Sequence, residues 1–453
     1  MKSTPIGPME RGCVTPRLIQ RITRTLGSFR ICRAKLTTAF LAALLFLQLP
    51  AFAAFRAGIA IRFVTPDPLL PVSGGVGPSH PVTKKEGDLT VRALVLENGG
   101  TRVAIVGSDF LGFPATLGAK VRGNIQGIPP ENILIGATHT HSAPDCYGFP
   151  DGKGGHAADL KYLDWVCTRM AEAVNEAVSK LQPASLRIAT GEAKGNIAYN
   201  YYAPQLYDPR CHVIQAIGQD GKPFATLVNY AVHPEVLGSS QGILSPDLVG
   251  PLCDRIHEKG GGLAIFMNGA QGGMVTADCR GPDGKDLRTW PECVRIGQLL
   301  ADEALRIVQS TPSQENPQLH CASRIVTFPI ESPTLLAVMK ASPLGHTADN
   351  ANRISTRVNL INLGNAQILT IPGEALPNIG FYLKRKMRGE HNFLFGLTND
   401  AFGYILTKED WGSFKRYDYV SRVCLGEMTG QILIDEALRL VSESPSPAKL
   451  VTK

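Results

Sequence analysis

The 453-residue chain lacks several features that would assign it to a common protein class. No segment is long and apolar enough to span a membrane: Leu36–Leu49 falls short of the roughly 20 residues that a spanning helix needs. The sequence has no internal repeat, and none of its cysteines has the C-x-x-C spacing of a structural zinc site. These absences exclude a repeat array, a zinc ribbon and a polytopic membrane protein.

Residues 1–53 differ in composition from the rest of the chain. They hold eight Lys and Arg against one Glu, followed by the apolar run and by Ala51-Phe52-Ala53, a small-x-small cleavage pattern. We interpret residues 1–53 as an export signal that is cleaved near Ala53, which predicts a periplasmic or secreted protein. An uncleaved membrane anchor is the alternative, and the short apolar run disfavours it.

The export signal also explains the net charge of +7. Of 46 basic and 39 acidic residues, the signal contains eight and one, so 38 of each sign follow it. The basic balance is therefore no argument for a nucleic-acid partner, and contact with a membrane is expected only transiently, at its surface.

Eight of the ten cysteines lie after residue 53, and some could pair in an exported protein. Cys279 and Cys293, which flank the polar loop Arg280–Glu292, are the candidate pair for a disulfide. The stronger expectation is that most of these cysteines are buried free thiols.

Strand-like and helix-like segments alternate along the chain after the signal, which predicts an α/β fold. We expect mixed β-sheets flanked by helices in one large catalytic domain over residues 54–442, followed by a loose tail over residues 443–453. Turn residues predict hairpins at Glu97-Asn98-Gly99-Gly100, at Gln219–Lys222 and at Gly364-Asn365. The clearest amphipathic helix is predicted over Leu160–Leu181.

Two histidines follow an apolar run, Ile133–Thr138, that reads as a strand. If the strand continues, His139 and His141 point to the same side at its carboxyl end, where they could hold a metal. A hydrogen-bonded pair on a half-exposed face is the other interpretation.

Three further apolar strands end near polar residues: His233, Asn268 and Glu374. Carboxyl ends of strands in α/β sheets form the crevice where ligands bind, so distant residues can converge there. Two histidines and one carboxylate are the ligand set of an open catalytic zinc site, in which the metal activates a water. Taken singly, His233 could be a turn residue and Glu374 a helix N-terminal acid.

Gly238-Ser239-Ser240-Gln241-Gly242 fits G-x-S-x-G, the motif that presents a nucleophilic serine in many hydrolases. That mechanism needs a strand directly before the serine and a helix directly after it. Here a Pro-containing turn follows, so Ser240 as a nucleophile is the less favoured alternative.

The sequence resembles the neutral/alkaline, non-lysosomal ceramidases, which are zinc amidases. The stretch Gly136-Ala137-Thr138-His139-Thr140-His141-Ser142-Ala143-Pro144 looks like their Gly-Thr-His-Thr-His-Ser-Gly-Pro signature. Similar motifs follow in the same order at Asn229–His233, at Ile371–Glu374 and at Asn399–Thr407 with Arg416-Tyr417-Asp418.

The resemblance implies a site that the spacing alone does not give. Zn²⁺ would be held by His139, His233, Glu374 and Tyr404, whereas His141 would stabilise the oxyanion or move a proton. Tyr417 would donate a hydrogen bond to the substrate. The implied activity is zinc-dependent hydrolysis of an amide bond in an N-acyl lipid, such as a ceramide, or in a smaller N-acyl compound.

The chain also departs from the family pattern. Gly272–Thr276 stands where the family has Gly-Asp-Val-Ser-Pro, and Ala198-Tyr199-Asn200 where it has an arginine. The family has an additional C-terminal β-domain, and we expect this chain to be a divergent member without it. These departures keep a second hypothesis open, in which the protein is a relative that binds zinc and ligand without catalysis.

Overall fold

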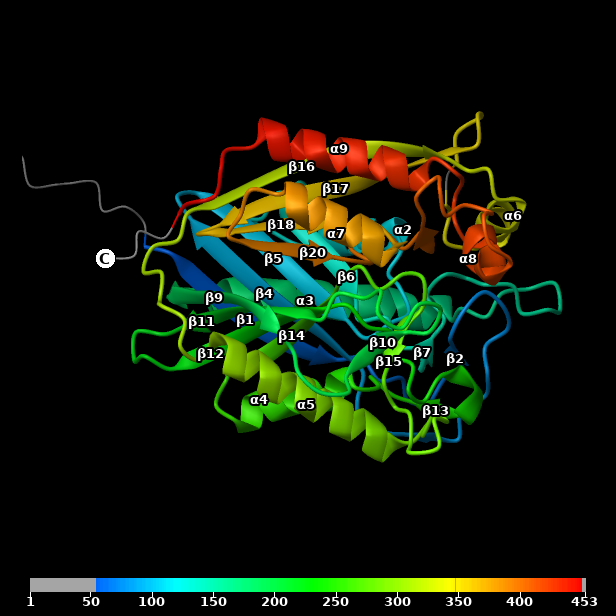
Figure 1. Ribbon diagram of the computed structural model, residues 1–453, viewed down its shortest axis with the longest axis horizontal. Coiled ribbons are helices and arrows are strands. Elements are labelled where there is room, and N and C mark those ends of the chain that lie inside the picture. The colour runs from blue at the N-terminus through cyan, green and yellow to red at the C-terminus, as the bar shows by residue number, and fades with distance from the viewer. Residues whose placement is uncertain (1–53, 347, 450–453) are drawn as a thin grey trace, which may run out of the picture. The chain divides into compact units, whose positions relative to one another are not determined.

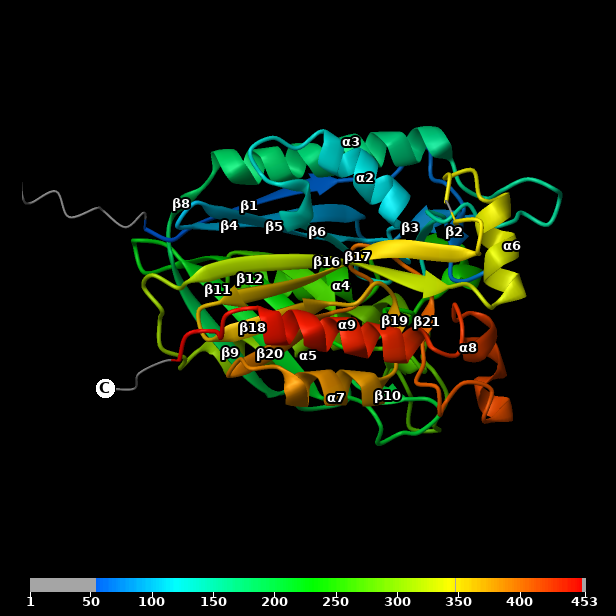
Figure 2. The same ribbon diagram turned by 90° about the horizontal axis from the view of Figure 1, so that it is seen from above.

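Three β-sheets pack around a shared apolar core, and helices cover the outer face of each sheet (Figures 1 and 2). The computed structural model describes residues 54–346 and 348–449, which fall within one compact unit. The proposed export signal, residues 1–53, lies outside the described residues. Among the described residues, no helix combines the length and the apolar character needed to cross a membrane.

The first sheet has the strand order β6-β5-β4-β1-β8. Its strands are β1 (Arg56–Phe63), β4 (Thr90–Asn98), β5 (Thr101–Ser108), β6 (Ile133–Ala137) and β8 (Gln182–Pro183). Gly99 and Gly100 both adopt positive φ angles, which the tight turn between β4 and β5 requires. Helices α2 (Ala115–Gly123) and α3 (Leu160–Ser179) cover the outer face, as Figure 2 shows.

The second sheet has the order β14-β12-β11-β9. It contains β9 (Ser185–Glu192), β11 (Arg210–Ile217), β12 (Pro223–Tyr230) and β14 (Leu263–Asn268). Helices α4 (Val249–Glu258) and α5 (Trp290–Val308) pack on its outer face (Figure 1). Because β12 and β14 are parallel, their carboxyl ends meet at the same edge.

The third sheet has the order β16-β17-β18-β20. It contains β16 (Leu319–Pro329), β17 (Arg353–Leu363), β18 (Ala366–Thr370) and β20 (His391–Phe395). Helices α7 (Pro377–Lys386) and α9 (Thr429–Glu443) cover it. The segment after α9 is attached at least in part, because the Ala448 N–H donates to the Gly364 carbonyl.

One end of the molecule is built from shorter elements. It contains β2 (Val72–Ser73), β7 (Ala143–Pro144), helix α6 (Pro333–Ala341) and helix α8 (Asp418–Arg422). β2, α6 and α8 lie at the same end of the molecule in Figures 1 and 2, and β7 pairs with β2. Two further short pairs are β10 (Ala198–Asn200) with β15 (Val275–Ala277), and β19 (Glu374–Ala375) with β21 (Tyr404–Ile405).

The predicted α/β fold with mixed, helix-flanked sheets is confirmed, and so are the three hairpins. The disulfide candidate is wrong in this structure: Cys279 and Cys293 are free, and seven of the eight described cysteines are buried thiols. Strands β9 and β20 and helix α6 were not expected.

Candidate metal centre

His139 lies just beyond β6 in a left-handed backbone conformation, with φ of 74°. The strand ends at Ala137, so the expectation that alternation along a strand aligns His139 and His141 is wrong. The His139 ring instead is held by its Nδ1, which lies 2.5 Å from the Leu111 carbonyl oxygen. A ring nitrogen bonded to a carbonyl carries the proton, so the Nε2 lone pair of His139 is free for a ligand.

His233 follows β12 and is oriented in the same way. Its Nδ1 lies 2.9 Å from the Val275 carbonyl oxygen, and its Nε2 lies 3.1 Å from Oε2 of Glu374. The Asn268 amide at the end of β14 donates to the carbonyls of Thr138 and Val232. Asn268 thereby joins the chain segments that carry His139 and His233.

Glu374 opens β19 and is 6% exposed. Its Oε2 also lies 3.4 Å from Nε2 of His139, so both histidines face one carboxylate oxygen. Burial alone would raise the pKa of Glu374, but His139 and His233 together hold it below its usual value. Glu374 is therefore a carboxylate at neutral pH. Burial alone would likewise lower the pKa of His233, and hydrogen bonding to Glu374 raises it.

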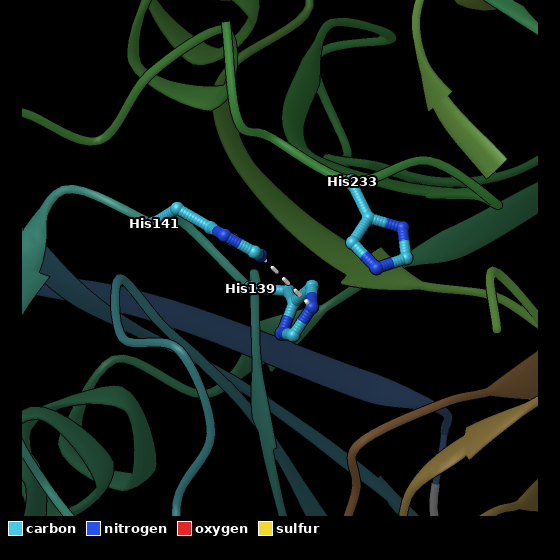
Figure 3. A group of neighbouring side chains, drawn as sticks. All are labelled: His139, His141 and His233. Carbon is cyan, nitrogen blue, oxygen red and sulfur yellow. Dashed lines mark hydrogen bonds between the residues drawn. The ribbon is translucent and has the colours of Figure 1, made fainter. Parts of the chain in front are cut away.

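His141 completes a group of three histidines, drawn in Figure 3. Its Nε2 lies 3.2 Å from Nε2 of His139, and its Nδ1 lies 3.7 Å from Oε2 of Glu235. Burial and the neighbouring histidines lower the pKa of His141 well below its usual value.

These side chains fit a divalent metal. His139, His141 and His233 offer ligand atoms that all lie within 4.8 Å of one another. His139 and His233 also share Glu374, and each uses its far nitrogen on a backbone carbonyl, the arrangement that orients histidine ligands in metal sites. The donor sets His139–His233–Glu374 and His139–His141–His233 both match open zinc sites.

Tyr404 lies beside this group and lines the cavity next to it, whereas Tyr417 does not. Tyr404 pairs in register with Glu374 across β19 and β21, and its hydroxyl donates to Sδ of Met274, 3.4 Å away. Burial and Glu374 raise the pKa of Tyr404 well above its usual value. Tyr417 packs against Tyr202, with ring centroids 5.6 Å apart, and is not among the residues that line the cavity beside the metal centre.

The cavity extends from His139, His141, Glu374 and Tyr404 toward helix α6. Its walls are mostly apolar and include Leu335, Val338, Met339 and Phe402. Four polar residues of this wall were not predicted from the sequence: Tyr147, His346, Asp400 and Tyr419. Two motifs named from the sequence lie near them: Asn399–Thr407 contains Asp400, and Arg416-Tyr417-Asp418 directly precedes Tyr419.

Ser240 lacks the geometry of a nucleophile. It is exposed within the 3₁₀ turn Ser239–Gln241, and the next helix, α4, begins only at Val249. The strand–turn–helix context that the G-x-S-x-G motif requires is therefore not present around Ser240, and the serine-hydrolase alternative is not supported.

The two segments that depart from the family pattern meet in space. β10 contains Ala198-Tyr199-Asn200, and it pairs with β15, in which Thr276 lies opposite Tyr199. β15 is also next to the metal centre, because the His233 N–H donates to the Val275 carbonyl. Both departures therefore alter one region beside His233.

Comparison with known proteins gives one consistent result. No family model matches the chain. Neutral ceramidase B of Dictyostelium discoideum is 27% identical over 133 residues, which is 26% of this chain and 18% of the relative. Neutral ceramidase A of the same organism is 28% identical over 134 residues, again 26% and 18%. The matched segment thus spans less than a fifth of these relatives.

Two solved ceramidase structures share the fold over most of this chain. A neutral ceramidase from Pseudomonas aeruginosa aligns with a TM-score of 0.68 at 17% identity, over 88% of this chain and 76% of its own. A ceramidase complexed with C2 aligns with a TM-score of 0.67 over 88% and 77%. Sequence matches and shared fold together support a relationship of this chain to the neutral ceramidase family.

Proposed function

We propose that the protein is a zinc-dependent amidohydrolase that cleaves an N-acyl lipid or a related N-acyl compound. The observation that carries the proposal is the pair of buried histidines, His139 and His233, that present Nε2 to the one carboxylate of Glu374. The names of the related proteins point to the same reaction class.

His139, His233 and Glu374 would hold the metal, with Tyr404 beside them as a fourth ligand. Zinc bound in such a site supplies Lewis acidity and lowers the pKa of a coordinated water toward 7. The carbonyls of Leu111 and Val275 hold Nδ1 of the two rings, so that Nε2 of each points toward Glu374.

His141 is our candidate for proton transfer and for stabilising the oxyanion. It lies beside the metal ligands, lines the cavity and contacts Glu235 through its second nitrogen. A neutral imidazole, which its lowered pKa favours, can accept a proton and pass it to a leaving amine. Tyr417 stays a candidate donor to the substrate, and Tyr419, which lines the cavity, joins it.

The substrate need not be ceramide itself. The altered pair β10 and β15 lies beside His233, where the family has the serine, aspartate and arginine that this chain lacks. The apolar wall formed by Leu335, Val338 and Phe402 suits an acyl or alkyl chain. We therefore assign the substrate class as N-acyl compounds with an apolar chain.

Metal analysis combined with hydrolysis assays tests this function. The purified protein should contain stoichiometric zinc and release fatty acid from ceramide or from shorter N-acyl amines. His139→Ala should lose the zinc and lower kcat/KM by more than the roughly 100-fold that follows the loss of a bond orienting a metal ligand. His257→Ala, which changes an exposed histidine of α4, is the matched control.

The outcomes separate the hypotheses. Zinc without turnover on any N-acyl substrate would favour the ligand-binding relative over the enzyme. A protein without zinc, or one in which His139→Ala leaves the activity unchanged, would overturn the proposal.

A further inference from the structure

Asp400 is an acidic residue among the mostly apolar residues that line the cavity. Leu335, Val338 and Phe402 are part of the same lining. Asp400 is 4% exposed, so it is shielded from bulk water. A carboxylate in such surroundings needs compensation, because burial penalises its charge.

The compensation within the described residues is partial. Oδ1 of Asp400 accepts the backbone N–H groups of Ala115 and Ala401, at 3.1 and 3.0 Å. The Thr356 hydroxyl faces the same carboxyl. Asp400 forms no ion pair with any residue that the structure describes.

Arg122, the cation whose charge acts on Asp400, donates its hydrogen bonds to other groups. Its guanidinium donates to the Ile133 carbonyl and to Oδ1 of Asn399. Burial accordingly raises the pKa of Asp400 to about 6 even though both N–H groups and Arg122 oppose the rise. The carboxyl is ionised in mildly basic solution.

An apolar cavity with one fixed polar group is the usual form of a site that orients a ligand. A ligand with a hydrogen-bond donor on its apolar chain would satisfy the Asp400 carboxylate. A ligand without a donor would bury the carboxylate unpaired, and such a site discriminates strongly against it.

We propose that Asp400 is a specificity-determining residue that accepts a hydrogen bond from a hydroxyl or ammonium group on the chain-bearing amine portion of the substrate. The inference rests on the proposed function for the identity of the substrate. The inference narrows the substrate class to N-acyl derivatives of amines that carry such a donor. It also places the amine product beside Asp400.

Binding of simple amphiphiles tests the assignment without turnover. Isothermal titration calorimetry at pH 8 would compare octylammonium, 1-octanol, octyl methyl ether and octyltrimethylammonium on the wild-type protein. The two ligands with a donor should bind about 10- to 100-fold more tightly than the ether, the range expected for a hydrogen bond to a charged group. Octyltrimethylammonium carries charge without a donor and should bind more weakly than octylammonium.

In Asp400→Asn, Oδ1 can still accept the N–H groups of Ala115 and Ala401. The amide Nδ2, which is a donor, then faces the ligand in place of a carboxylate oxygen. This variant should lose the preference for donor ligands. Asp247→Asn is the matched control: Asp247 is buried, accepts the N–H groups of Leu237 and Leu248, has a pKa raised by burial to about 6, and does not line the cavity. It should keep the wild-type preference.

Equal binding of all four ligands, or an unchanged preference in Asp400→Asn, would overturn the proposal. If Asp400→Asn does not fold, the wild-type comparison of octylammonium with octyltrimethylammonium and of octanol with its methyl ether decides alone. Because no readout depends on hydrolysis, a protein that shows the preference but cleaves no amide would contradict only the proposed function.

Discussion

Gly272 shows how closely the backbone is packed at the candidate metal centre. A Cβ atom built on this residue would lie 2.1 Å from the Glu374 carbonyl oxygen and 2.8 Å from the Ala375 carbonyl carbon. The Gly272 N–H also donates to the Ala375 carbonyl. Both neighbours are backbone atoms, so no side chain can turn away to make room.

Gly272→Ala should therefore shift β19 and carry Glu374 away from His139 and His233. We expect the free energy of unfolding to fall by about 1–3 kcal/mol, the usual effect of an overpacked methyl group. We also expect weaker zinc binding, measured by metal analysis after dialysis against a chelator.

The control for this substitution is Gly123→Ala. Gly123 ends α2, and a Cβ atom there would meet nothing within 4 Å. This variant should match the wild type in metal content and be equally or more stable. Full zinc retention in Gly272→Ala would show that Glu374 is not held by this contact.

At the scale of the elements, a row of hydrogen-bonded polar side chains connects α7 to the second and third sheets. Nζ of Lys384 in α7 lies 2.8 Å from both Oδ2 of Asp208 and Nε2 of His212. Nδ1 of His212 lies 2.9 Å from the Thr190 hydroxyl, which lies 3.0 Å from Nδ1 of His391. Since the Lys384 ammonium donates to Nε2, His212 must be neutral with its proton on Nδ1.

From this row of hydrogen-bonded side chains we predict that the fold is sensitive to acid. Burial and the Lys384 ammonium hold the pKa of His212 well below its usual value. Above about pH 6.5 neither the folded nor the unfolded state protonates His212, whereas below it only the unfolded state does. As the pH drops below about 6.5, the free energy of unfolding should therefore decrease, by up to about 1.4 kcal/mol per pH unit from His212 alone.

Urea unfolding between pH 7 and pH 5 measures this dependence. His212→Asn should be less stable at pH 7 and should show a shallower loss toward pH 5. His257→Asn, at an exposed position, should keep the wild-type slope. Parallel slopes for His212→Asn and the wild type would contradict the assignment.

The elements that the sequence predicted are those set by local signals. The turn at Gly99-Gly100 and the periodicity of α3 need no knowledge of distant residues. β20 was missed because it pairs with β18 in parallel through a helical crossover, which no short motif announces. Helix α6 did have a signal: the Ser332 hydroxyl accepts the Leu335 N–H, and Pro333 follows the cap.

At the scale of the whole molecule, the candidate centre joins segments from separate sheets. His139 follows β6 of the first sheet, His233 follows β12 of the second, and Glu374 follows β18 of the third. Strand ends were enough to predict that these three residues meet. Tyr404 was reached only through the family resemblance, and Asp400 not at all, because loops and long-range pairings form the cavity wall.

A metal held between three sheets should stabilise the entire fold. Zinc that binds the folded state alone raises the free energy of unfolding by about 2.7 kcal/mol at a free concentration 100 times its dissociation constant. Removal of zinc with a chelator should therefore lower the unfolding midpoint in a thermal scan, and added zinc should restore it. His139→Ala should show little response to zinc, whereas His257→Ala should respond as the wild type does. A midpoint that is the same with and without zinc in the wild type would show that the three histidines and Glu374 pack together without a metal. The convergence of the three sheets would then need no ligand to explain it.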